Sequence, residues 1–326
     1  MRTVIISYAV LAVCCSAVHI DTTLHPLGTP IRLLDAHELQ AELDAQRLAN
    51  PPQFPWQSFS AGYVSLALAA TVDWRQKGGV TPAKDQGPHG FCGTFARVAA
   101  AEGQFALHSG EPQANFSVQQ LVDCVGWDLD QSSVIVDGHT GFMTSERYPY
   151  NESCATPSQC DADPPVPGNP CRYERSQIVH GSAGFTNMTS VPLASGKADE
   201  DQLAAFVHHN GPVTIGIYAP VFGLRDNSTC GGVGGGCWVT SAACDTVKGK
   251  SIDHSITIIG YGVDQTIDAR TGKPYGKYWL IKNSWSTSFA DNGFIKIARG
   301  VKCGNLLEAD ATLYTYGDPA AYYEAA

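Results

Sequence analysis

The chain has 326 residues, of which 44% are hydrophobic and 16% are charged, and its formal net charge at pH 7 is −10. This composition is typical of a globular protein and argues against a largely disordered chain. No run of lysine or arginine occurs in the sequence, so neither a nucleic acid nor an anionic membrane is expected as a partner.

The N-terminus has the pattern of a secretory signal peptide. Arg2 precedes an apolar run over residues 4–13, and the small residues Ser16 and Ala17 follow it, which is the order that such signals have. The run is too short to span a bilayer. We therefore expect residues 1–17 to be removed and the mature protein to be a soluble monomer of the secretory pathway, either extracellular or in a lysosome or vacuole.

Residues 18–70 differ in composition from the rest of the chain. They contain no cysteine, and they combine a helical pattern over residues 36–48 with a proline-rich break over residues 50–55. We interpret this segment as a short propeptide. Residues 71–326 are rich in glycine and in short apolar runs, which favours a compact domain of the α+β class.

Three helices are predicted in this domain. The first begins at Cys92, carries apolar residues at largely helical spacing and ends at Ser109, so one face can be buried. The second begins at Ser117, which is predicted to form a capping box with Gln120. The third is amphipathic and covers residues 200–209.

Four short segments rich in β-branched and aromatic residues follow the third helix. They are predicted to form antiparallel strands. The segments are Val213–Ile217, Ser255–Tyr261, Lys277–Lys282 and Gly293–Ala298. The predicted architecture is a helical lobe over about residues 80–175 and a sheet lobe over about residues 176–316, with a cleft between them.

The cysteine count agrees with an oxidising compartment. The chain has 11 cysteines; two lie in the signal peptide, and Cys92 is set aside as a reactive thiol. The even remainder can form disulfides and comprises Cys124, Cys154, Cys160, Cys171, Cys230, Cys237, Cys244 and Cys303. Zinc is the alternative, but the paired Cys-x₂-Cys spacing of zinc sites is missing, so no metal or other cofactor is expected.

Four Asn-x-Ser/Thr sequons lie in polar, turn-rich stretches. Such triplets are acceptors for N-glycosylation in secreted proteins, and ordinary turn chemistry is the alternative explanation of each. The predicted sites are Asn115, Asn151, Asn187 and Asn227.

Four polar residues have the types that nucleophilic catalysis requires. Cys92 opens a helix, where unpaired N–H groups favour the thiolate; a buried inert cysteine or a disulfide partner is the alternative. Gln86 lies six residues earlier and can donate to an oxyanion. His254 begins a predicted strand, where a core histidine would be unremarkable, but Asn283 ends another strand and can fix its tautomer. Trp285, beside Asn283, can exclude water.

Five short motifs lie along the chain, with Cys92 between them. They are Val72–Gly78, Val80–Gln86, Asp253-His254, Tyr261-Gly262 and Tyr278–Trp285. In these motifs and their order, the sequence resembles papain-like cysteine peptidases, the papain and cathepsin family, over about residues 71–316. The resemblance implies a two-lobe fold, in which a helical lobe and an antiparallel β-barrel-like lobe enclose the active-site cleft.

The resemblance also implies a role for each of the four residues. Cys92 would be the nucleophile, His254 the acid and base, Asn283 the orienting amide and Gln86 the oxyanion donor. The implied activity is that of an endopeptidase that cleaves polypeptides through an acyl-enzyme on Cys92, and the protein's own propeptide is a possible inhibitor. An exopeptidase is an alternative, although residues 151–171 contain no histidine or lysine to hold a substrate carboxylate.

The sequence departs from the family around the nucleophile. His89 replaces a cysteine and Gly93 replaces an aromatic residue, and the glycine-rich cysteine motif expected after Cys124 is missing. In the family the two lost cysteines bond to each other, so their joint absence is consistent. These departures motivate a second alternative, a catalytically inactive relative that binds proteins.

The resemblance implies some disulfides and one specificity pocket. It pairs Cys124 with Cys171 and places Cys303 with Cys230, Cys237 or Cys244, and the remainder leaves Cys154 with Cys160. It also places Glu308 at the floor of the main recognition pocket and Gly216 on the opposite wall, so the pocket would be roomy and negatively charged. The alternative is that Glu308 faces solvent.

Overall fold

The computed structural model describes residues 71–125, 135–136, 139–151, 170–196, 198–225 and 237–316. The predicted signal peptide and propeptide lie outside these residues, as do Cys154, Cys160, Cys230 and Asn227. Of the other predicted glycosylation sites, Asn115 and Asn151 are exposed, and Asn187 lies within a strand. Each helix in the described ranges is too short or too polar to cross a membrane.

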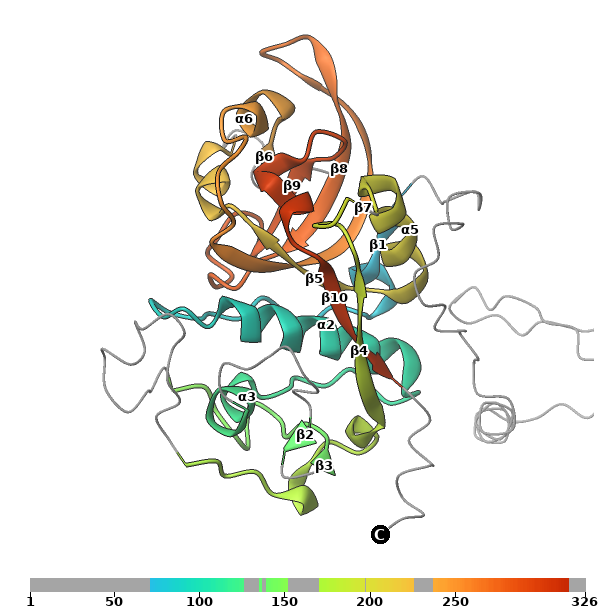
Figure 1. The fold of residues 1–326 in the computed structure, drawn as a ribbon, viewed down its shortest axis with the longest axis vertical. Helices are drawn as coiled ribbons and strands as arrows, with labels where there is room; N and C mark the ends of the chain where they lie inside the picture. Colours follow the sequence, from blue (N-terminus) through green and yellow to red (C-terminus); the bar gives the residue numbers. More distant parts are fainter. Residues whose placement is uncertain are drawn as a thin grey trace, which may run out of the picture. The chain divides into compact units, whose positions relative to one another are not determined.

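Helix α2, Cys92–His108, lies between the two parts of the domain (Figure 1). On one side of it are helix α3, Val118–Cys124, and the short strands β2, Ile135–Val136, and β3, His139–Thr140. On the other side is the large sheet. Every residue of α2 from Thr94 to Phe105 except Arg97 is buried, because both parts of the domain pack against this helix.

The large sheet has the strand order β4-β10-β5-β7-β8-β9-β6, and β1 pairs with β7. Its strands are β1 Val72–Asp73, β4 Phe185–Val191, β5 Val213–Ile217, β6 Trp238–Val239, β7 His254–Asp268, β8 Lys273–Lys282, β9 Phe294–Ala298 and β10 Ala311–Tyr316. All pairs are antiparallel except β6 with β9, which is parallel. The described strands form an open path, so the barrel-like closure that the resemblance implies is not complete.

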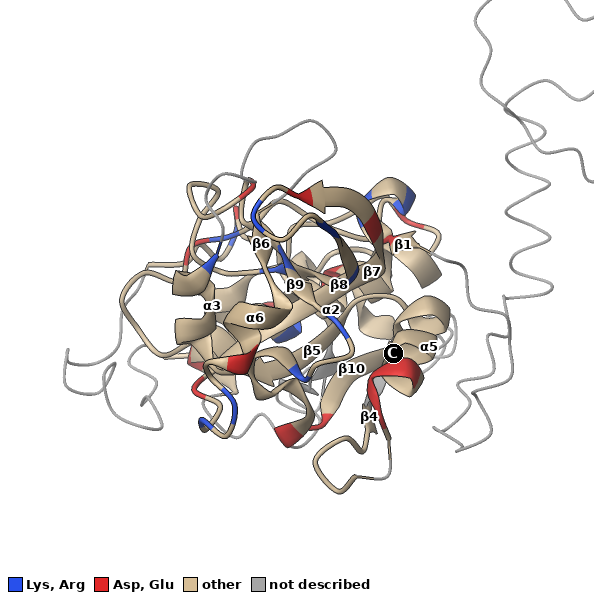
Figure 2. Cartoon of the chain, turned by 90° about the horizontal axis from the view of Figure 1, so that it is seen from above, with Lys and Arg blue, Asp and Glu red and all other residues tan. Residues whose placement is uncertain are grey.

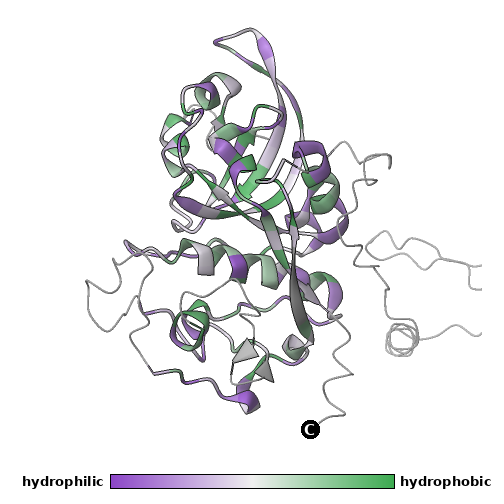
Figure 3. Cartoon of the chain, viewed as in Figure 1, coloured by the Kyte–Doolittle hydropathy of each residue, from purple (hydrophilic) through white to green (hydrophobic). Residues whose placement is uncertain are grey.

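The predicted strands correspond closely to four members of this sheet. The bounds of β5 are those predicted, and β9 starts one residue late. Strands β7 and β8 extend beyond the prediction as a hairpin, because the added residues pair through backbone hydrogen bonds although many are exposed. Hydrophobic residues gather on the central strands of the sheet (Figure 3).

Strands β4 and β10 connect the two parts of the domain. Phe185 and Tyr314 pack with the aromatic residues around α2 and α3, whereas Val191 and Leu313 belong to the core of the sheet. The two strands pair with each other over their length. Each of these two strands thus contributes residues to both core clusters.

The capping of the smaller helices differs in detail from the prediction. Ser117 accepts a hydrogen bond from the Gln120 backbone N–H at 2.9 Å, but the Gln120 side chain binds Gly141 O and Met143 N instead of completing a capping box. A complete capping box occurs at helix α5, Glu200–Asn210, between Asp199 and Gln202.

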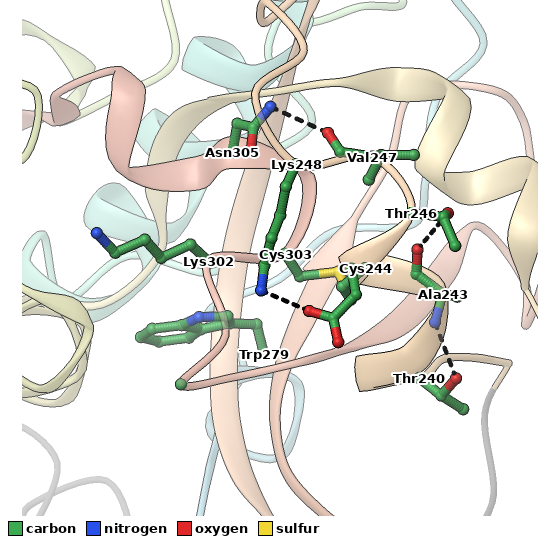
Figure 4. The surroundings of a disulfide bond; sticks show 12 residues. Thr240, Ala243, Cys244, Thr246, Val247, Lys248, Trp279, Lys302, Cys303 and Asn305 are labelled. Atoms are coloured by element: carbon green, nitrogen blue, oxygen red, sulfur yellow. Dashed lines mark hydrogen bonds and ion pairs between the residues drawn. A yellow bond between two sulfur atoms is a disulfide. The ribbon is translucent and has the colours of Figure 1, made fainter.

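Two disulfides are fully defined. Cys124 is bonded to Cys171, and Cys244 is bonded to Cys303; Cys237 is also disulfide-bonded. Figure 4 shows the second bond, which links helix α6, Ser241–Asp245, to the 3₁₀ segment Cys303–Glu308. Of the three partners left open for Cys303, the structure thus has Cys244.

A buried ion cluster joins helix α2 to strand β8. Glu102 is fully buried and accepts hydrogen bonds from Thr81 Oγ1, Lys84 Nζ and the Phe116 backbone N–H. Lys282 Nζ lies 3.7 Å from Glu102 Oε2 and donates to Thr81 Oγ1 at 2.7 Å. Burial lowers the pKa of Lys282 to about 8, and Glu102 opposes this shift.

Charged residues of both signs are interspersed over the surface elements (Figure 2). The buried cluster is different, because one carboxylate there serves two lysines. Removing one member of a buried ion pair leaves an uncompensated charge in a medium that solvates it poorly. Glu102 is therefore the residue on which this junction depends.

We predict that Glu102→Gln lowers the free energy of unfolding by about 3–5 kcal/mol, because Lys84 and Lys282 lose their anionic partner. Urea unfolding followed by circular dichroism measures this loss. The matched control is Glu111→Gln, since Glu111 pairs with the exposed His180 at 2.9 Å and such pairs contribute less than about 1 kcal/mol. Equal losses in the two variants would contradict the importance assigned to the buried cluster.

Candidate active site

Cys92 is the first residue of helix α2 and the one free cysteine of the described ranges. Its side chain is half-buried. Burial raises the pKa of the thiol, and the strongest opposing effect comes from the Ser255 backbone. Because Ser255 directly follows His254, Cys92 lies near the start of the histidine's strand.

His254 and Asn283 are in direct contact. His254 begins β7, Asn283 follows the end of β8, and His254 Nε2 lies 2.8 Å from Asn283 Oδ1. Asn283 Oδ1 also accepts the Ser284 backbone N–H at 2.8 Å, which fixes the orientation of the amide. Since an amide oxygen can only accept, Nε2 carries a proton and Nδ1 remains for the thiol.

Aromatic rings enclose this pair. Trp285 lies 4.9 Å from the His254 ring at an interplanar angle of 30°, and Phe222 lies edge-on to both rings. His254 and Asn283 are only 8% and 2% exposed. The rings therefore cover the hydrogen bond between imidazole and amide.

Gln86 is held from both ends of its amide. Its Oε1 accepts from Ser284 Oγ at 2.6 Å, and its Nε2 donates to His89 O at 2.8 Å. The Gln86 backbone N–H also donates to Ser284 O at 2.9 Å. One hydrogen of Nε2 is left for a further acceptor. Ser284, which the sequence reasoning missed, thus links the Gln86 side chain to Asn283.

Tyr150 supports the segment that precedes Cys92. Its hydroxyl donates to Gln86 O at 2.7 Å. Its ring lies edge-on to Phe95 at 4.9 Å and to Phe91 at 6.5 Å. Phe91 is the residue before Cys92 and is buried. An aromatic cluster thus supports the segment before Cys92, and no single sequence motif predicts this role.

The thiol and the imidazole each resist carrying a charge alone. Burial raises the pKa of the Cys92 thiol, although hydrogen bonds from Ser255 and Gly93 oppose the shift. Burial lowers the pKa of His254, although Asn283 and Asp253 oppose that shift. The helix N-terminus favours the thiolate. Burial thus disfavours the charged form of each group, and an opposite charge close by would offset that cost.

The two residues expected in a recognition pocket have different surroundings. Glu308 is exposed, whereas Gly216 is half-buried. A Cβ atom built on Gly216 would lie 2.8 Å from Ile252 Cδ1 and 3.1 Å from the Ala309 Cβ. The immediate neighbours of Gly216 are thus apolar side chains. Ile252 was not singled out by the sequence reasoning, although it lies two residues before His254.

Nothing in the described part of the chain groups three or more side chains that could hold a metal ion. The side chains of Cys92, His254, Asn283 and Gln86 supply a thiol, an imidazole and two amides. Such a set can transfer an acyl group: the thiol attacks, the imidazole moves a proton, and an amide N–H stabilises negative charge on oxygen.

Comparison with known proteins agrees with this description. Residues 68–313 match the model of a family described as papain family cysteine protease. The sequence is 31% identical over 279 residues to the Senescence-specific cysteine protease SAG12 of Arabidopsis thaliana, covering 82% of this chain and 67% of that protein. The matches to other plant cysteine proteinases span 58% and 66% of their lengths.

Two solved structures resemble the fold. The Carica candamarcensis cysteine protease CMS1MS2 is 28% identical, with a TM-score of 0.54, and the match covers 77% of this chain and all of that one. The digestive procathepsin L 3 of Tenebrio molitor is 25% identical with the same TM-score of 0.54, covering 79% of this chain and 73% of that one.

The contacts of Tyr150 generate a prediction. Tyr150→Phe removes only the hydroxyl that donates to Gln86 O, so we expect a loss of about 0.5–1.5 kcal/mol in unfolding free energy. Tyr150→Ala also removes the ring from Phe91 and Phe95, so we expect a loss of about 3–5 kcal/mol. Chemical denaturation of both variants separates the two contributions. Similar losses for both would show that the ring contacts do not support this segment.

Proposed function

The chain belongs to the papain family of cysteine proteases, and from this we propose that it is a cysteine endopeptidase with Cys92 as nucleophile, His254 as acid and base, Asn283 as orienting amide and Gln86 as oxyanion donor. The observation that carries the proposal is the hydrogen bond of 2.8 Å between His254 Nε2 and Asn283 Oδ1, which leaves Nδ1 available to a thiol at the start of α2.

Acylation begins when the Cys92 thiol passes its proton to His254 Nδ1 and the sulfur attacks the carbonyl carbon of the scissile bond. The carbonyl oxygen becomes an oxyanion, which accepts hydrogen bonds from the Gln86 amide and from the Cys92 backbone N–H. The C–N bond then breaks, and His254 gives its proton to the departing amine. The products of this step are an amine and a thioester on Cys92.

Deacylation repeats these roles with water. His254 removes a proton from a water molecule, the resulting hydroxide attacks the thioester carbon, and the C–S bond breaks. The sulfur recovers a proton from the imidazole, and the peptide acid leaves. Throughout the cycle Asn283 keeps the Nε2–H bonded, so the imidazole does not turn away from the sulfur.

The side chains around Gly216 support a preference for certain substrate side chains on the acyl side of the scissile bond. The apolar side chains of Ile252 and Ala309 beside Gly216 suit an apolar substrate side chain. Glu308, next in sequence to Ala309 and exposed, can form a charge-assisted pair with an arginine. We propose that the protein accepts both kinds of residue at this position.

The precursor is proposed to carry its own inhibitor in residues 18–70 and to travel through the secretory pathway. Procathepsins among the structural relatives support a propeptide, and disulfides support an oxidising compartment. Glycosylation at Asn115 and Asn151 is consistent with their exposure.

The proposal is tested by single substitutions assayed on an unspecific peptide ester. We expect Cys92→Ser to reduce turnover to background, because a hydroxyl is a far weaker nucleophile here. We expect Gln86→Ala to lower kcat by about 100-fold, the scale of one oxyanion donor. Circular dichroism checks that each variant is folded. Turnover near that of the unchanged protein in Cys92→Ser would refute the nucleophile assignment, and failure of a thiol-directed probe to label Cys92 would favour an inactive binding protein.

The coupling between thiol and imidazole gives a pH prediction. Without His254 no imidazole can accept the thiol proton, and burial raises the pKa of the thiol. Alkylation of Cys92 in His254→Ala should therefore follow one titration with its midpoint above the ordinary pKa of a cysteine. The unchanged protein should react at neutral pH, because the imidazole takes the proton. The rate of iodoacetamide alkylation from pH 5 to 10 measures both profiles. Equal rates at pH 7 would mean that the helix N-terminus alone ionises the thiol.

A further inference from the structure

An open hollow of about 590 Å³ lies beside the proposed catalytic imidazole. It is lined by residues of the 3₁₀ segment Ala219–Leu224, and by Arg225, Asp253, Trp285 and Phe289. Asp253 directly precedes His254, and Trp285 packs on the His254 ring at 4.9 Å. The hollow therefore adjoins the proposed active site on the side where His254 lies.

This side is where the departing half of a substrate would lie. In the proposed mechanism His254 protonates the leaving amine, so that half of the peptide passes the imidazole. The register of the sheet agrees with this direction: Gly216 pairs with Ser255, Ile217 pairs with His254, and the chain then continues to Ala219 at the hollow. Gly216 and the hollow thus lie on opposite sides of the pair between Ile217 and His254.

Arg225 places a positive charge at the hollow, and no described side chain neutralises that charge. Its guanidinium carbon lies 5.5 Å from the centroid of the Phe289 ring, and its Nη1 donates to Phe222 O at 3.1 Å. Its Nε is buried and has no hydrogen-bond partner. Among the described residues no carboxylate lies within ion-pair distance of Arg225, whereas Asp253 Oδ1 is occupied by the Ala219 backbone N–H at 2.7 Å.

We propose that Arg225 binds a carboxylate on the leaving side of the scissile bond. A guanidinium held against a ring presents its remaining donors in a fixed plane, which matches the two oxygens of a carboxylate. The carboxylate can come from an acidic side chain or from the C-terminus of a short substrate. The second source would give the enzyme a carboxypeptidase activity besides internal cleavage. This inference rests on the proposed function.

The test uses four peptides that differ only beyond the scissile bond. The residue after the cut is Glu or Gln, and the C-terminus two residues further on is a free acid or an amide. For the unchanged protein we expect kcat/KM to favour the carboxylate in at least one comparison by about 10–100-fold, the scale of one hydrogen bond to a charged group. The Glu and Gln amides isolate the side chain, and the two Gln peptides isolate the terminal carboxylate.

Arg225→Gln should bring the favoured ratio close to one, and Arg225→Lys should keep part of it, because charge remains but the planar fork is lost. Arg270→Gln is the control, because Arg270 is an exposed arginine paired with Asp268 on the β7–β8 hairpin; its ratios should equal those of the unchanged protein. Titration with a thiol-directed inhibitor sets the concentration of active enzyme in every variant.

Ratios near one for the unchanged protein, or ratios that Arg225→Gln leaves as they were, would overturn the inference. A fall in kcat/KM that is equal for all four peptides would also overturn it, since Arg225 would then only support the fold of the hollow. If the unchanged protein cleaves none of the peptides, including the neutral Gln amide, the proposed function fails instead. The two failures are thereby distinguishable.

Discussion

The carboxylate of Glu102 is the interaction on which the arrangement of the site depends. It lies in the middle of α2, and it binds the segment that leads to Gln86 through Thr81 and Lys84. It also faces Lys282, the residue before Asn283. One buried group thus connects the helix that carries Cys92, the loop that carries Gln86 and the strand that precedes Asn283. A buried charge tolerates little displacement, because its partners cannot be replaced by water.

From this junction the polar residues form one continuous chain of contacts. Ser284 binds the Gln86 amide and offers its backbone N–H to Asn283, which in turn holds His254. Each link fixes the orientation of the next side chain, and the aromatic rings of Trp285 and Phe222 cover the last link. Gln86 and His254 are therefore positioned by the same end of β8. A shift of that strand would move both, so in the proposed mechanism its anchoring to α2 affects the chemistry as well as the stability.

Much of this could be predicted from local sequence patterns, and the rest depends on contacts between distant residues. Helix α2 and strand β5 follow from apolar periodicity, and their predicted starts agree with the structure. Strands β4 and β10 were missed because their residues mix polar and apolar types and each is defined by pairing with the other, more than a hundred residues away. The pairing of Cys303 with Cys244 could not be chosen for the same reason, since several cysteines precede it at similar distances. Tyr150 and Ser284 carry no chemical signature of their own and act only through the residues they hold.

The protonation of the site is another property that position alone does not decide. A cysteine at a helix N-terminus is expected to ionise easily, yet burial of Cys92 opposes that tendency, and burial of His254 opposes the charge on its partner. The same low-polarity surroundings that penalise a single charge strengthen the attraction between two opposite charges. In the proposed mechanism, covering the site with Trp285, Phe222 and the Phe91–Tyr150 cluster therefore couples loss of the thiol proton to protonation of the imidazole. An enzyme of this kind would lose activity at both ends of the pH range. Low pH protonates the thiolate and high pH deprotonates the imidazolium, and either change removes one charge of the pair.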